Sequence, residues 1–177
     1  MRNRKHGDFV VISQEIWSIY ESSFPPEERR DLQSQKSILK CDHYHVIPLR
    51  DDGNTVGFIA YWRLPDLVFV EHLAIKNGMR GKGYGTKAIK QLTAKYPSVV
   101  LEVEKPTTQE AKRRISFYQH LGFHLNQYSY MQPPYDAKKQ PVPLLLMTYP
   151  HQVDAAEFSL IRHTLYSTVY KTNDAVL

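Results

Sequence analysis

The sequence predicts a mixed α/β fold, and two observations support this. Short strand-like runs alternate with amphipathic helical segments along a chain of 177 residues. A glycine-rich turn at residues 80–86 lies between a predicted strand and a predicted helix. A chain of this length with 42% hydrophobic residues can build one domain with a sizeable core. We expect seven strands and four helices in the order βααβββαβαββ, followed by one more helix.

The first part of the chain predicts one strand and two helices. Residues 9–12 form an apolar run typical of a strand, and Ser13 can cap the helix that follows. That helix has apolar residues at helical spacing: Ile16, Trp17, Tyr20 and Phe24. A Pro25-Pro26 pair ends it. We expect a second helix from Glu27 to about residue 39, with Pro26 in its first turn.

The rest of the chain predicts six strands and two helices. An Asp-Asp-Gly-Asn turn at residues 51–54 joins two strands as a hairpin. One helix follows the glycine turn as far as about Tyr96, and another is capped by Thr107 or Thr108 and closed by Gly122. The strands are expected at 43–50, 55–64, 67–75, 99–104, 123–131 and 142–149.

The turn Arg80-Gly81-Lys82-Gly83-Tyr84-Gly85-Thr86 has the features of an anion site. Alternate glycines leave backbone N–H groups uncovered, and a helix N-terminus adds unpaired N–H groups and partial positive charge. A phosphate or pyrophosphate, and hence a nucleotide-like ligand, fits such a turn. The spacing matches neither the Walker A loop nor the dinucleotide fingerprint. A plain loop is the alternative for the cluster taken alone.

A second motif indicates a family. After the strand at 99–104, the chain reads Phe117-Tyr118, then three residues, then Gly122-Phe123. Together with Arg80-x-x-Gly83-x-Gly85, this resembles the GNAT superfamily of acyl-CoA-dependent N-acetyltransferases. The resemblance covers about residues 8–150 and implies the GNAT fold, with a mixed, mostly antiparallel seven-stranded sheet. One departure is Ala111, where members often carry an Asn that helps hold the CoA arm.

The resemblance also implies acetyl-CoA as co-substrate and direct attack of an amine on its thioester. Backbone N–H groups of the glycine turn would hold the pyrophosphate. The strand before the turn would pair with the pantetheine arm as an added strand does. The expected cofactor contacts are Leu73, Ile75, Arg80, Gly81, Lys82, Gly83, Tyr84, Gly85 and Thr86.

A general base is needed because an alkyl ammonium has a pKa near ~10.4. Glu71 is the leading candidate, because the resemblance places an acid on this strand and alternation puts Glu71 on the face of Phe69 and Leu73. His72 is expected to face the other way, toward helix packing. A structural ion pair is the alternative role for Glu71, and the acids at 102 and 104 are alternative bases.

Tyr118 matches the family tyrosine that protonates the departing thiolate, with a role in the core as the alternative. Acceptor contacts are expected from the first two helices and the last hairpin, at Phe24, Glu28 and Tyr130. We expect a primary amine of a small molecule as acceptor. The alternatives are a protein amine, and a non-catalytic module that binds acyl-CoA. Cys41-x-His43-x-His45 lacks a second ligand pair, so no metal is expected.

Composition limits the partners. A net charge of +5 and a pI of about 9.2 come from scattered basic residues, and no nucleic-acid-binding module is recognisable. No apolar run has membrane-spanning length. The basic N-terminus lacks the apolar segment of a secretory signal and is expected to be a disordered tail. A single cysteine suits the reducing cytoplasm.

Two segments are expected: a GNAT acetyltransferase domain at 8–150 and a C-terminal helical extension at 151–177. Apolar residues of the extension recur at helical spacing: Phe158, Ile161, Leu165 and Val169. This helix is expected to cover its own domain, with a homodimer contact as the alternative.

Overall fold

The computed structural model describes residues 12–172, and the structural statements below concern these residues. One seven-stranded sheet has the order β1-β2-β3-β4-β7-β5, and β6 also pairs with β7. Among the strands of residues 12–172, β3 and β4 pair in parallel and the other pairs are antiparallel. The strands are β1 (Tyr44–Asp51), β2 (Asn54–Arg63), β3 (Val68–Ile75), β4 (Val99–Glu104), β5 (His124–Leu125), β6 (Tyr130–Gln132) and β7 (Val142–Tyr149). This confirms the predicted fold class. The expected N-terminal tail lies outside the described residues, as does the expected first strand except for Ile12, which is in neither strand nor helix.

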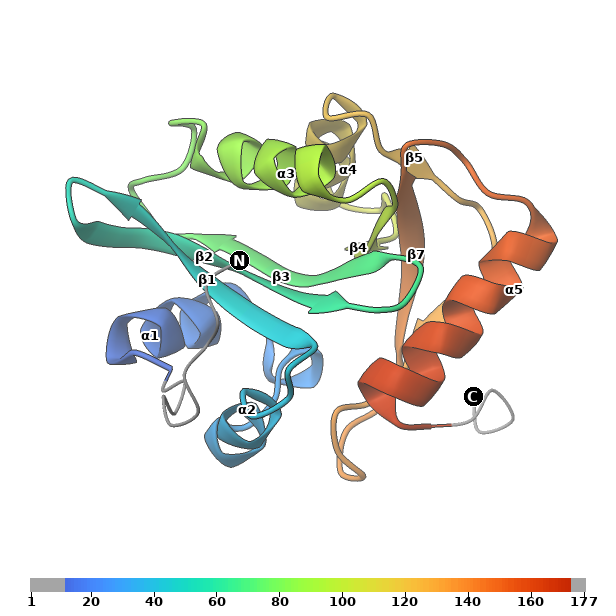
Figure 1. Cartoon of the computed structure of the whole chain (residues 1–177), viewed down its shortest axis with the longest axis horizontal. Coiled ribbons are helices and arrows are strands. Elements are labelled where there is room, and N and C mark those ends of the chain that lie inside the picture. The colour runs from blue at the N-terminus through green and yellow to red at the C-terminus, as the bar shows by residue number, and fades with distance from the viewer. Residues whose placement is uncertain (1–11, 173–177) are drawn as a thin grey trace.

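Helices cover both faces of the sheet (Figure 1). α3 (Tyr84–Lys95) and α4 (Gln109–Gln119) lie on one face, and α1 (Gln14–Ser23) and α2 (Leu32–Ile38) on the other. Each face has its own apolar core. Ile89 of α3 packs with Val70 and Leu101 on the α3/α4 side, whereas Tyr20 of α1 packs with Phe69 on the α1/α2 side.

The chain after β7 belongs to the α1/α2-side core. α5 (Ala155–Thr164) begins with a capping box between Asp154 and Glu157, and a π-helical turn (Leu165–Tyr170) continues it. Four side chains of this segment lie buried in the same cluster as Leu146 of β7: Phe158, Leu165, Tyr166 and Val169. The segment therefore covers its own domain, as one of the two readings of its sequence expected.

The second helix differs from the expectation of one helix over 27–39. Pro26–Glu28 forms a single 3₁₀ turn, and the backbone at Arg29 is extended before α2 begins at Leu32. The Asp31 side chain accepts a 2.7 Å hydrogen bond from the Ser34 amide and so starts α2 as a separate helix. The extended segment brings Arg30 back to the sheet, where it binds a carboxylate of β3.

The strand expected over 123–131 is also interrupted, into β5 and β6. Asn126 is fully buried between them, and its side chain donates to the Leu146 carbonyl and to the Thr148 hydroxyl. Its Oδ1 accepts the Val153 amide at 3.1 Å. These side-chain hydrogen bonds hold the chain between β5 and β6, and alternation in the sequence did not reveal them.

The C-terminal segment offers a matched test of its packing. Leu165→Ala should lower the free energy of unfolding by about 2–5 kcal/mol, because the side chain is 0% exposed in the core. Leu160→Ala, the same substitution in a side chain that is 69% exposed, should change it by less than ~0.5 kcal/mol. Denaturant unfolding of both variants measures the difference, and equal losses would contradict docking of this segment on the sheet.

Candidate active site

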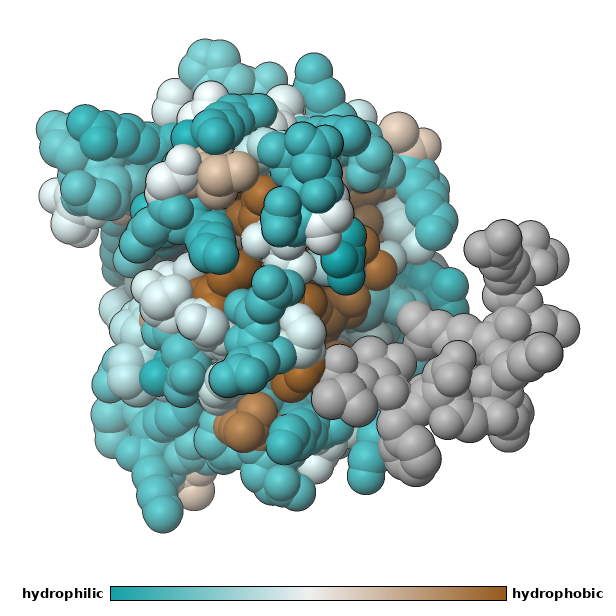
Figure 2. Space-filling model, turned by 90° about the vertical axis from the view of Figure 1, so that its left-hand side faces the viewer, coloured by the Kyte–Doolittle hydropathy of each residue, from teal (hydrophilic) through white to brown (hydrophobic). Residues whose placement is uncertain are grey.

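The sheet opens between its two parallel strands. β3 and β4 pair only through Val68–Val70 and Val99–Leu101, and beyond these residues a cleft of about 890 Å³ separates them. The second half of β3 keeps its pairing with β2 on the other edge. On the cleft side its backbone therefore has no strand partner within residues 12–172. Figure 2 looks onto this end of the molecule and shows apolar side chains in a hollow among hydrophilic ones.

The glycine turn closes one end of the cleft. Gly81 (φ +77°) and Gly83 (φ +83°) adopt the left-handed conformation, and Gly83 caps the N-terminus of α3. A side chain at either position would meet no atom within 4 Å, so the backbone angle rather than crowding requires glycine. Of the predicted cofactor contacts, all except Lys82 line the cleft. The Lys82 ammonium instead lies 3.6 Å from the Met79 sulfur, at the surface.

A β-bulge decides where the acid of β3 points. Ala60 of β2 pairs with His72 and Tyr61 with Val70, so Glu71 is the extra residue of β3. Glu71 and His72 consequently both reach the α1/α2 side, where the His72 ring meets Tyr20 at 4.8 Å. The expectation that strict alternation separates Glu71 from His72 was wrong.

The bulge also separates Glu71 from Leu73. Phe69 remains on the α1/α2 side with Glu71, but Leu73 packs in the α3/α4-side core. We expected Glu71, Phe69 and Leu73 to share one face of the sheet, and this expectation is wrong for Leu73. The physical reason is that one inserted residue shifts the two-residue period of a strand by one.

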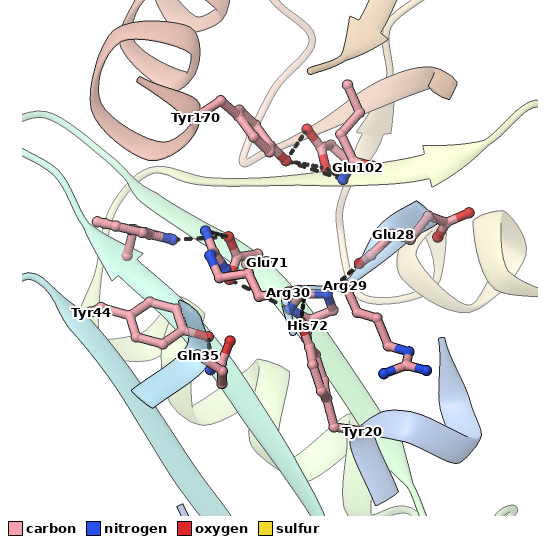
Figure 3. Close-up of polar contacts among 12 residues, drawn as sticks. Tyr20, Glu28, Arg29, Arg30, Gln35, Tyr44, Glu71, His72, Glu102 and Tyr170 are labelled. Atoms are coloured by element: carbon pink, nitrogen blue, oxygen red, sulfur yellow. Dashed lines mark hydrogen bonds and ion pairs between the residues drawn. The ribbon is translucent and has the colours of Figure 1, made fainter. Parts of the chain in front are cut away.

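Glu71 forms a buried ion pair with Arg30 (Figure 3). The two guanidinium nitrogens donate to the two carboxylate oxygens at 2.7 and 2.8 Å, and the Trp62 indole N–H donates at 3.2 Å. Burial alone would raise the pKa of Glu71, but the charges of Arg30 and His72 outweigh it and hold the pKa far below its usual range. A carboxylate so strongly held is a weak proton acceptor, which favours the structural reading of Glu71 over the catalytic one.

A second carboxyl faces the cleft from β4. Burial raises the pKa of Glu102 to about 7, even though three hydrogen-bond donors oppose this shift. Tyr130 donates to one carboxylate oxygen and Gln132 to the other at 2.9 Å, while Tyr170 lies 2.9 Å from both. Tyr130, predicted to contact the acceptor, lies behind Glu102 rather than on the lining of the cleft.

The sequence did not single out two of these partners. Gln132 lies just beyond the strand expected at 123–131, and Tyr170 lies 68 residues from Glu102. Arg30 was likewise assigned to a helix. No local pattern could have found these contacts, because each depends on chain segments that meet only in the folded sheet.

Tyr118 lines the cleft from α4, on the side opposite to Glu102. Burial raises the pKa of its hydroxyl to about 12, so the phenol keeps its proton at neutral pH. Its ring lies edge-on to Phe117 and Phe123, at 5.0 and 5.6 Å. The position suits a proton donor inside the cleft.

The α1/α2 end of the cleft is acidic. Phe24 and Glu28, which were expected to contact the acceptor, line this end of the cleft together with Glu104 of β4. Burial raises the pKa of Glu28, and the nearby Glu104 carboxylate raises it further. Glu104 is itself paired with Arg114 at 2.9 Å. His72 holds this end in place, since its Nε2 donates to the Glu28 carbonyl at 2.9 Å.

Comparison with known proteins identifies the family. The profile described as "Acetyltransferase (GNAT) family" matches residues 9–123, well over half of the chain. The chain belongs to this family. A solved GNAT-family structure from Bacteroides thetaiotaomicron, provisionally named an acetyltransferase, is 36% identical with a TM-score of 0.82. That match covers 90% of this chain and 92% of the other, so it includes residues beyond 150.

Two further matches are more limited. YjbC of Bacillus subtilis (strain 168), also provisionally named an acetyltransferase, is 30% identical over 104 residues, which are 56% of this chain. The chain thus spans about half (52%) of that curated relative. A GNAT acetyltransferase from Elizabethkingia anophelis, solved with acetyl-CoA bound, shares the fold at 12% identity and a TM-score of 0.50, over 67% of this chain and 82% of the other.

Within 12–172, no three His, Cys, Asp or Glu side chains are grouped so that they could hold a metal ion. None of the helices in that range is long and apolar enough to cross a membrane.

Loss of the Arg30–Glu71 ion pair is expected to lower the stability of this GNAT protein strongly. Glu71→Gln should lower the free energy of unfolding by roughly 3–5 kcal/mol at pH 7, because it leaves the buried Arg30 charge unpaired. Glu71 has a lowered pKa in the folded state, so its contribution is present above its ordinary pKa of 4.5 and is lost as the pH falls. The difference between parent and variant should therefore shrink in acid.

The matched control is Glu104→Gln, which removes an acid from an exposed pair with Arg114. It should change the free energy of unfolding by less than about 1 kcal/mol. Urea titrations at pH 7 and pH 4 measure both variants. A small, pH-independent loss in Glu71→Gln would contradict a buried, ionised Glu71.

Proposed function

We propose that this protein transfers an acetyl group from acetyl-CoA to a primary amine by direct attack of the amine on the thioester. The observation that carries the proposal is the cleft between β3 and β4. Its lining brings together a glycine turn at a helix N-terminus, an unpaired strand edge, a buried carboxyl group and a protonated tyrosine. The reaction has three requirements: the cofactor must be held, the amine must be deprotonated and the thiolate must be protonated. Each of these features serves one of the three.

The cofactor would bind along β3 and the start of α3. Backbone N–H groups from Arg80 to Thr86 are placed for a pyrophosphate, since α3 directs its positive end at this turn. The free edge of β3 from Leu73 to Ile75 would pair with the amide groups of the pantetheine arm. Outside the cleft, a groove lined by Lys90, Lys112 and Arg113 adjoins Thr86 and offers positive charge to a phosphate.

The proton acceptor in this proposal is Glu102. A base works best when its pKa lies near the working pH, and burial brings the pKa of Glu102 to about 7. Glu71 and Glu102 both reach the α1/α2 side, but the Arg30 guanidinium makes Glu71 the weaker base. Tyr118, on the α3/α4 side, would give its proton to the CoA thiolate.

The acceptor in this proposal is a small cationic amine that enters from the α1/α2 side. Glu28 and Glu104 place two carboxyl groups at that end of the cleft, and Phe24 supplies an apolar wall. Carboxylates there would attract an amine that carries a second positive charge, such as a diamine. A protein amine is the alternative acceptor.

The glycine turn gives the first test of the proposal. Gly83→Glu should weaken acetyl-CoA binding at least about tenfold, because it places a carboxylate against the pyrophosphate and strains a backbone at φ +83°. Gly53→Glu is the control, since Gly53 has a φ of +80°, an equally open surrounding, and no place on the cleft lining. Calorimetric titration measures both. Equal weakening in the two variants would place the pyrophosphate elsewhere.

Turnover gives the second test. Release of the CoA thiol should show a kcat that rises through a pH of about 7 as Glu102 ionises, and Glu102→Gln should lower kcat by roughly 10²–10⁴-fold. Tyr118→Phe should also slow the reaction but keep the rise near pH 7. A rise that persists in Glu102→Gln would show that another group is the base.

The same assay identifies the acceptor class. Primary amines with and without a second positive charge are compared, together with peptides that offer an N-terminal or lysine amine. Higher kcat/KM for the dicationic amines supports the acidic end of the cleft as the acceptor site. Thiol release with the peptides alone would replace the small acceptor by a protein one, and binding of acetyl-CoA without any thiol release would indicate a binding module.

A further inference from the structure

The C-terminal segment ends against Glu102, a residue that lines the cleft. The π-helical turn that follows α5 is held by two buried side chains, Leu165 and Val169, which are 0% and 3% exposed. The Tyr166 hydroxyl donates to the Met131 carbonyl at 2.6 Å and so fixes the turn beside β6. The turn ends at Tyr170, whose ring packs against Tyr135 at 5.5 Å.

Tyr170 points from this turn at the carboxyl group of Glu102 (Figure 3). Its hydroxyl lies 2.9 Å from each of the two carboxylate oxygens and accepts a hydrogen bond from the Gln132 amide at 3.1 Å. With that amide as donor, the phenolic hydrogen is free to be given to Glu102. The contact is thus a donation from Tyr170 to the carboxylate.

The groups around Glu102 come from three further elements. Tyr130 and Gln132 of β6 donate to it, and Tyr170 does so from the C-terminal turn. Glu71 on β3 is the charge of like sign that faces it, and Arg30 is paired with that charge. All three neighbours that hydrogen-bond to Glu102 act as donors, an arrangement that an ionised carboxylate satisfies in full.

We propose that Tyr170 is a positioning residue for the general base: its hydroxyl holds the Glu102 carboxylate on the wall of the cleft, so that the C-terminal segment completes the active site. The inference rests on the proposed function only in naming Glu102 the base. The family profile ends at residue 123, so the three residues that hold this carboxyl group all lie outside the matched region.

The role has a measurable consequence. A hydrogen bond to the charged form of a carboxyl group favours that form and lowers its pKa. Tyr170→Phe removes only the hydroxyl, so burial of Glu102 is then opposed by two donors instead of three. The pKa of Glu102 should rise by about one unit, from the strength of a hydrogen bond to a charged group.

The experiment follows this carboxyl group directly. The full chain is labelled with glutamate carrying ¹³C in its side-chain carboxyl group, and the signal of Glu102 is assigned by its absence in Glu102→Gln. Its pKa is then measured by NMR titration in the parent, in Tyr170→Phe and in Tyr166→Phe. Tyr166→Phe is the matched control, because it removes a hydroxyl from the same turn that bonds to the Met131 carbonyl. The kcat–pH profile is recorded for the same three proteins.

A rise of about one unit in the pKa of Glu102 in Tyr170→Phe, with no change in Tyr166→Phe, supports the proposal. An unchanged pKa in Tyr170→Phe, or equal shifts in both variants, overturns it, because the second outcome would reflect loosening of the turn as a whole. The kinetic profile separates this result from the proposed function. If the pKa moves but the acid limb of kcat does not follow, Tyr170 still holds Glu102, and it is the assignment of Glu102 as the base that fails.

Discussion

The buried ion pair between Arg30 and Glu71 is the interaction on which the rest of this site depends. It joins the extended segment before α2 to the bulge in β3, one residue beyond the point where β3 and β4 stop pairing. A charged pair in this position is stable only because both guanidinium nitrogens and the Trp62 indole satisfy the carboxylate. The pair thereby fixes how the N-terminal segment lies over the opening of the sheet, and with it the acidic end of the cleft.

The two carboxyl groups of the opening show how position decides chemistry. Glu71 and Glu102 lie on adjacent parallel strands and reach the same side of the sheet, and burial acts to raise the pKa of both. A guanidinium beside Glu71 keeps it ionised. The three donors to Glu102 are neutral, so burial leaves its pKa near neutrality. The same residue type therefore serves structure at one position and suits proton transfer at the other.

The family-matched part of the chain and the part after it contribute different residues to the site. The family-matched part supplies the glycine turn, the free edge of β3 and Tyr118, which are the parts of the site that would meet the cofactor. The part after residue 123 supplies Tyr130, Gln132 and Tyr170 around the carboxyl group that would meet the amine. The matched segment thus also holds Phe24, Glu28, Glu102 and Glu104 of the cleft lining, and the later part of the chain adds the hydrogen bonds around Glu102.

The sequence by itself determined the fold class and the glycine turn that closes the cleft, because both depend on local patterns. Strand alternation and helix caps are properties of a few neighbouring residues, and Ser13 and Thr108 cap their helices as predicted. Only the tertiary structure decided the acid–base chemistry. One inserted residue in β3 turned Glu71 toward Arg30, and the turn at Tyr170 met a strand 68 residues away. A pKa is set by burial and by charges that lie close in space, and the order of residues along the chain does not contain those distances.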